Sequence, residues 1–217
     1  MKNSIADISE RKAAIVAGLG ILILVITGAY VFFALNTGLD VPGDAAIKAA
    51  NDIKTNQWLL CIFILSLLIM ITCNVILALT LYVLVKSVNY DHALLAAVIR
   101  LIYAIMFTIS MVFLFFVPLS FSTVFIIGQI IYALHILILG YLIFKSGYIP
   151  RILGVLLIIG GSLGYLIESF TFFFFPNYVW IAAPGIVVAT IADILLGIWL
   201  LLKNGKIPDM IEEISEE

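Results

Sequence analysis

This sequence has few charged residues. Asp, Glu, Lys and Arg make up 11 % of its 217 residues, whereas soluble domains average about 25 %. Hydrophobic residues make up 65 %, so the folded chain would have too little polar surface to cover itself in water. The composition excludes an ordinary cytosolic enzyme, a disulfide-stapled secreted module and a disordered tail. It identifies an integral membrane protein that contacts the lipid bilayer.

Basic residues, cysteine and histidine are also scarce. The 11 Lys and Arg and 13 Asp and Glu give a net charge of −2, and no basic stripe of the kind that binds nucleic acid is present. We therefore expect no nucleic-acid partner. Cys61 and Cys73 would be about 18 Å apart on one helix, too far for a disulfide or a shared metal, and we interpret both as small buried hydrophobes. The sequence has no His-Glu-x-x-His motif for zinc, and we expect neither a metal nor another cofactor.

Long apolar windows predict six membrane-spanning helices. They lie near residues 13–35, 58–85, 93–117, 122–144, 150–174 and 180–202. The first window is longer than the apolar core of a signal peptide, so we expect it to remain as a membrane anchor. The predicted fold class is an all-α membrane protein, a polytopic bundle of six transmembrane helices that forms a single membrane domain over residues 1–217.

The distribution of Lys and Arg predicts the orientation of this bundle. Six spans place both termini on one side of the membrane, and eight basic residues fall on that side: Lys2, Arg11, Lys12, Lys86, Lys145, Arg151, Lys203 and Lys206. Only Lys48 and Lys54 fall on the opposite side. The positive-inside rule therefore places both termini in the cytoplasm. The aromatic run at residues 170–180 is then expected to anchor the outer interface.

Two polar segments lie outside the predicted spans. The outer loop, residues 36–57, contains a short helical pattern that Asp44 could cap. The tail, residues 204–217, is acidic and carries an apolar stripe at helical spacing. Either segment could recognise a membrane-protein partner or a second copy of the chain, and a solvated end is an equally good interpretation of the tail.

Four ionisable residues fall inside the predicted spans, where their cost marks candidate sites. They are Arg100, His135, Glu168 and Asp193, and polar residues three positions away extend each into a stripe on one helix face. The predicted ligand-binding layer comprises Asn74, Arg100, Tyr103, His135, Ser162, Tyr165 and Asp193. Gln129 and Tyr132 lie on the His135 stripe.

Helix rise places most of this layer near the middle of the membrane. Four residues come out about 15 Å from the cytoplasmic end: Asn74, His135, Ser162 and Asp193. Arg100 comes out at about 12 Å. Arg100 and Asp193 can therefore meet, and Asn74 and His135 can join them. Glu168, at about 25 Å, has no basic partner in reach, and we interpret it as a candidate proton carrier.

Three functions remain open for the protein. A fourth interpretation is that the polar layer is a structural network that fixes the register of the helices. We expect binding, and as an extension transport, of a small polar or amphiphilic molecule or a lipid. The first alternative is a non-catalytic partner subunit of a membrane complex. The second is an intramembrane serine hydrolase, because Gly160-Gly161-Ser162-Leu163-Gly164 matches G-x-S-x-G and His135 lies at similar depth. Mid-helix Gly160-x-x-x-Gly164 is more typical of close helix packing, so we assign no catalytic residue.

Several segments resemble one prokaryotic family. They are Arg11-Lys-Ala-Ala-Ile-Val-Ala-Gly18, Leu81-Tyr82 to Lys86 with Arg100, Tyr141-Leu-Ile-Phe-Lys-Ser-Gly-Tyr-Ile-Pro150-Arg151-Ile-Leu-Gly154 with Gly164-Tyr165, and Trp199-Leu-Leu-Leu-Lys203. The chain is similar to the integral membrane proteins catalogued as domain of unknown function 4386. The resemblance implies six helices in a prokaryotic cytoplasmic membrane and no defined activity. We interpret Gly147 and Pro150 as the parts of a tight turn before the fifth span.

Overall fold

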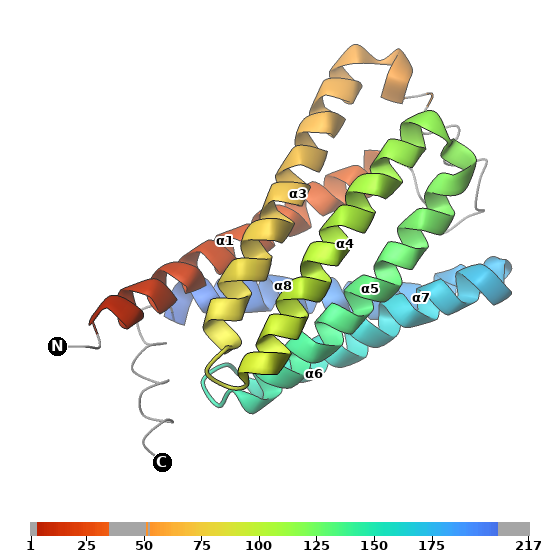
Figure 1. Cartoon of the computed structure of the whole chain (residues 1–217). Helices are drawn as coiled ribbons and strands as arrows, with labels where there is room; N and C mark the ends of the chain where they lie inside the picture. Colours follow the sequence, from red (N-terminus) through yellow and green to blue (C-terminus); the bar gives the residue numbers. More distant parts are fainter. Residues whose placement is uncertain (1–3, 35–50, 52, 204–217) are drawn as a thin grey trace.

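A computed structural model of the chain describes residues 4–34, 51 and 53–203, and it is all-helical, without strands, over that part (Figure 1). The helices are α1 (Ser4–Ala34), α3 (Gln57–Val85), α4 (Tyr90–Phe116), α5 (Pro118–Lys145), α6 (Arg151–Leu156), η1 (Leu157–Ser162), α7 (Leu163–Phe174), η2 (Pro176–Ala182) and α8 (Ala183–Lys203). The predicted cap at Asp44 and the acidic tail at residues 204–217 lie outside the described residues.

Six helical segments are long and apolar enough to cross a membrane, which confirms the predicted number of spans. α6, η1 and α7 together form the fifth span, and η2 with α8 forms the sixth. Large apolar side chains such as Leu79 and Ile105 are exposed along these spans and contact the bilayer. Cys61 is one of the exposed residues, so its predicted burial was wrong, whereas Cys73 is buried. Both positions lie on α3, and only one faces the interior of the bundle.

Local sequence signals set the ends of the helices. The side chains of Asn56 and Asn89 accept hydrogen bonds from the backbone N–H three residues later and so cap α3 and α4. Gly147 has φ 74°, a left-handed conformation that favours glycine, and Pro150 directly precedes α6. The tight turn predicted at Gly147 is therefore confirmed.

The six spans form a ring in which neighbours along the chain are also neighbours in space. α3, α4 and α5 pack side by side, and α1 and α8 cross behind them (Figure 1). The fifth span packs against both α5 and α8, and α8 packs against α1, which in turn packs against α3. The contact between α1 and α8, the first and last spans, closes the ring, so a residue can face a common axis from every span.

Glycine pairs allow the helices of this ring to approach closely. A Cβ added at Gly164 would lie 2.9 Å from the carbonyl carbon of Gly185 on α8, and one added at Gly160 would lie 2.7 Å from the backbone nitrogen of Ala189. Only glycine fits such distances, and the helix-packing interpretation of Gly160-x-x-x-Gly164 is confirmed. Gly18 of α1 meets Gly197 of α8 in the same way.

The fifth span is not a uniform α-helix. Residues Leu157–Ser162 form a π-helical segment between α6 and α7. A π turn holds one extra residue, which rotates the following helix relative to the preceding one. The faces of α6 and α7 therefore do not follow one continuous helical period.

Candidate functional site

A hydrogen bond between Arg100 and His135 forms the centre of the polar layer. Arg100 is 3 % exposed and His135 is 1 % exposed, and their Nη1 and Nε2 atoms lie 2.9 Å apart. The Nδ1 atom of His135 lies 2.8 Å from the backbone oxygen of Ala96. Because a carbonyl only accepts and a guanidinium only donates, Nδ1 carries the proton and Nε2 accepts. His135 is therefore a neutral imidazole oriented from both sides by α4.

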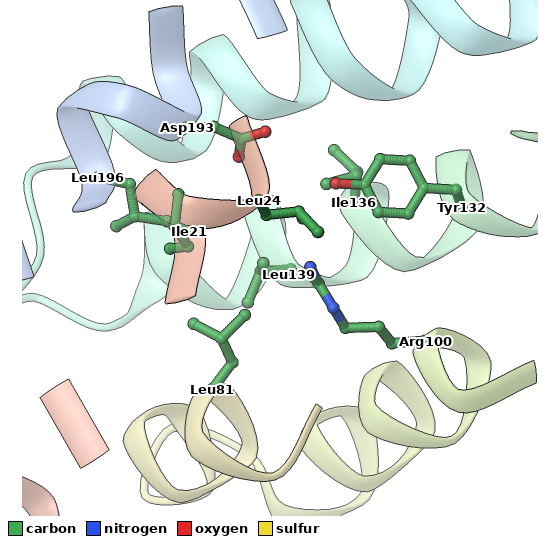
Figure 2. Close-up of a pocket in the computed structure, with 9 residues that line it drawn as sticks. All are labelled: Ile21, Leu24, Leu81, Arg100, Tyr132, Ile136, Leu139, Asp193 and Leu196. Atoms are coloured by element: carbon green, nitrogen blue, oxygen red, sulfur yellow. The ribbon is translucent and has the colours of Figure 1, made fainter. Parts of the chain in front are cut away.

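Within the described part of the chain, Arg100 has no carboxylate partner. No ion pair is formed between Arg100 and any acidic side chain among the residues that the structure describes, and the buried Nε atom of Arg100 has no hydrogen-bond partner. Asp193 is the acidic residue that faces it, but the two are separated by a cavity. Figure 2 shows the Arg100 and Asp193 side chains on opposite sides of this cavity, with the Tyr132 hydroxyl turned toward the same space.

The cavity lies on the axis of the helix ring. It is lined by Ile21, Leu24, Leu81, Arg100, Tyr132, Ile136, Leu139, Asp193 and Leu196. These residues come from α1, α3, α4, α5 and α8, five of the six spans. The space open to the centre of a water molecule is about 10 Å³, which is room for about one water. We call this space the axial cavity.

Three tyrosines extend the polar layer away from Arg100. The ring centroid of Tyr132 lies 4.6 Å from that of Tyr103 and 5.3 Å from that of Tyr165, so α4, α5 and α7 meet at this cluster. The guanidinium carbon of Arg100 lies 5.8 Å from the centroid of the Tyr132 ring, within cation–π range. Tyr165 and Glu168 lie three residues apart on α7, a spacing that places them on one face of the helix. The cluster thus connects the axial cavity to the level of Glu168.

The remaining predicted residues are buried but do not join the Arg100–His135 network. Asn74 is 1 % exposed, and its Nδ2 donates to the Met70 oxygen of its own helix at 3.0 Å while its Oδ1 has no partner. Ser162 Oγ and one carboxyl oxygen of Glu168 are likewise buried without a hydrogen-bond partner among the described residues. None of the three lines the axial cavity.

This geometry does not favour the hydrolase alternative. A serine nucleophile needs a base that accepts its proton. Both ring nitrogens of His135 are engaged, by Arg100 and by Ala96, and Ser162 Oγ makes no hydrogen bond to either. In the described part of the chain no group of three or more His, Cys, Asp or Glu side chains could hold a metal.

Sequence reasoning left two parts of this site out of the predicted layer. Tyr132 lies one helical turn before His135, and that spacing is the signal that could have included it. Ile21 and Leu24 on α1 line the axial cavity with apolar side chains, and no sequence signal distinguishes them from other buried residues of that span.

Comparisons with known proteins agree with the resemblance described above. The family described as Domain of unknown function (DUF4386) matches the chain in two segments, residues 16–123 and 119–204. An uncharacterized protein of Archaeoglobus fulgidus is 28 % identical over 148 residues, which cover 68 % of this chain and 87 % of that protein. No solved structure matches the chain.

Proposed function

This chain belongs to the DUF4386 family, and we propose that its axial cavity binds a small molecule that carries an anionic group. As an extension, we propose that the protein also transports that molecule across the membrane. The protein would act in a prokaryotic cytoplasmic membrane, with both termini in the cytoplasm.

The observation that carries the proposal is the unpaired charge of Arg100. Burying a cation is costly unless an anion compensates it, and the hydrogen-bond partner of Arg100 is a neutral imidazole. An imidazole in this tautomer satisfies one N–H of the guanidinium but supplies no negative charge. The compensating anion must therefore come across the axial cavity, from Asp193 or from a ligand that lies between them.

The axial cavity is small. Room for about one water is too little for an organic anion, so binding requires the ring to open. Without a bound anion, Asp193 would balance Arg100 across the cavity that both residues line. A bound anion would take over that role, and Glu168 would supply or remove the proton that keeps the total charge of the layer constant.

Native mass spectrometry of gently extracted protein tests the proposal. We expect a bound anionic small molecule in the wild type and its loss in Arg100→Gln. Arg11→Gln is the matched control, because Arg11 is exposed at the start of α1 and should leave occupancy unchanged. Equal occupancy in all three proteins would overturn the proposal. So would the absence of any bound mass together with a large difference in melting temperature between wild type and Arg100→Gln, which is the result expected of a structural network.

A further inference from the structure

A second cavity lies at the end of the bundle where the fourth span ends, the fifth begins and the sixth ends. It is lined by Gly147, Tyr148, Ile149, Pro150, Arg151, Trp199 and Lys203. Its volume is about 350 Å³, within the range of small-ligand sites, about 300–1,000 Å³. We call it the turn cavity, because five of its seven lining residues belong to the turn between α5 and α6 or to the first residue of α6.

The turn cavity lies at the level of the lipid headgroups. α5 ends at Lys145, α6 begins at Arg151 and α8 ends at Lys203, so three spans leave the apolar core of the membrane here. Trp199 is half-buried one turn before Lys203, and tryptophan is typical of the membrane–water boundary. A lipid headgroup can therefore reach this cavity without leaving the bilayer.

The charges that line the turn cavity select an anion. Arg151 and Lys203 are both exposed cations, and the described lining residues include no Asp or Glu. The guanidinium carbon of Arg151 lies 5.9 Å from the centroid of the Phe144 ring, within cation–π range. A guanidinium carries five N–H donors and no acceptor. The arginine fork matches the oxygens of a phosphate, and the lysine adds a mobile point charge. We propose that the turn cavity binds the phosphate of an anionic membrane lipid.

Hydrogen bonds hold the wall of the turn cavity in place before any lipid arrives. Ser146 Oγ donates to the Ile143 carbonyl at 2.8 Å and accepts from the Ile149 backbone N–H at 3.2 Å. The Tyr148 hydroxyl donates to the carbonyl of Leu84 at the end of α3. Burial raises the pKa of Tyr148 to about 12, so this hydroxyl keeps its proton at physiological pH. A preformed wall lowers the entropy cost of binding.

This inference gives a role to the run from Ser146 to Arg151, which the axial cavity does not use. The same turn that reverses the chain between two spans also places Arg151 in the lining of the cavity that Lys203 shares. The inference is independent of the proposed anion site, since the two cavities share no lining residue.

Native mass spectrometry in detergent micelles, with phosphatidylglycerol titrated against phosphatidylcholine, tests the inference on the full chain. Removing one cation near a membrane surface should weaken binding of the anionic lipid about fivefold. We therefore expect Arg151→Gln with Lys203→Gln to weaken phosphatidylglycerol about thirty-fold and to leave phosphatidylcholine unchanged. Lys86→Gln is the matched control, an exposed cation of the turn after α3 that does not line the cavity.

Three results would overturn the inference. The first is equal phosphatidylglycerol affinity in the double variant and in Lys86→Gln. The second is an equal loss for both lipids, which would indicate a general loss of lipid contact. The third is displacement by millimolar inorganic phosphate at unchanged ionic strength, which would assign the site to free phosphate. Arg100→Gln should keep wild-type lipid affinity, so failure of the axial proposal is distinguishable from failure of this one.

Discussion

The axial cavity and the turn cavity use the same kind of cation in opposite surroundings. Arg100 is buried, and its charge is compensated only across a space that holds about one water. Arg151 is exposed at the edge of a cavity of about 350 Å³. Charge interactions are strong and poorly screened at the first position, and weaker and salt-dependent at the second. We therefore expect a selective anion site on the axis and a lipid-phosphate site of modest affinity at the turn.

The two cavities also differ in how the chain builds them. The axial cavity needs side chains from five spans, so it exists only when the ring is closed. The turn cavity is built mainly from one short segment that its own hydrogen bonds hold. Substitutions can therefore be chosen that damage one cavity and spare the other.

The largest effect is expected where the ring closes. In Gly160→Ala the new Cβ would lie 2.7 Å from the backbone nitrogen of Ala189 and 2.6 Å from Cγ1 of Val188, so α8 must move away from η1. Overpacking of this kind costs about 2 to 3 kcal/mol of unfolding free energy. Thermal unfolding in detergent measures the loss, and we expect binding in the axial cavity to weaken with it.

Gly128→Ala is the matched control for this substitution. Its added Cβ would meet Met106 Cβ at 3.6 Å, an ordinary contact, and alanine is favoured over glycine within a helix by about 1 kcal/mol. We therefore expect Gly128→Ala to melt at or slightly above the wild-type temperature. If the two variants melt together, helix contact at Gly160 does not hold the ring closed.

A smaller effect is expected from the partner of Arg100. His135→Phe keeps a ring of similar shape but leaves Nη1 of the buried guanidinium without its partner. The Ala96 carbonyl loses only its second hydrogen bond, because it still accepts a backbone N–H within α4. Leaving buried groups of this kind unpaired costs about 2 kcal/mol. Thermal unfolding should show this loss, and phosphatidylglycerol binding at the turn cavity should stay at the wild-type value.

His92→Phe provides the comparison at the membrane surface. His92 is exposed at the start of α4, and its Nδ1 lies 2.7 Å from Oδ1 of Asn89. Loss of this exposed hydrogen bond should cost about 0.5 kcal/mol, less than the loss of the buried one. Similar losses in the two histidine variants would show that the Arg100–His135 hydrogen bond adds nothing beyond a surface contact.

Much of this arrangement could be predicted from residue patterns. Apolar windows predicted six spans, Gly160-x-x-x-Gly164 predicted a close helix contact, and Gly147 predicted a turn; each is confirmed. These features depend on composition or on spacing within one short segment. They are therefore visible without knowing where the other helices lie.

The partner of Arg100 could not be predicted in the same way. Helix rise places His135 and Asp193 at almost the same depth, so depth alone does not decide which of them contacts the guanidinium of Arg100. The choice depends on the rotation of each helix about its own axis and on which helices are neighbours. α5 packs directly against α4, whereas α8 lies across the ring, and His135 is therefore the residue that Arg100 reaches.

The smallest loss of stability is expected from a substitution at the turn. Unlike the substitutions at Gly160 and His135, it should change lipid binding at the turn cavity and leave binding in the axial cavity unchanged. Gly147→Ala forces a residue with a Cβ into φ 74°, which costs about 1 kcal/mol. The strain is confined to the turn, so it should weaken phosphatidylglycerol binding severalfold by displacing Arg151, while the mass bound in the axial cavity stays at wild-type occupancy. Gly28→Ala, whose Cβ would lie 3.8 Å from Met70 Cε, is the matched control and should alter neither. Loss of the axial ligand in Gly147→Ala would mean that the turn and the ring axis are mechanically coupled, and the two cavities would then have to be treated as one site.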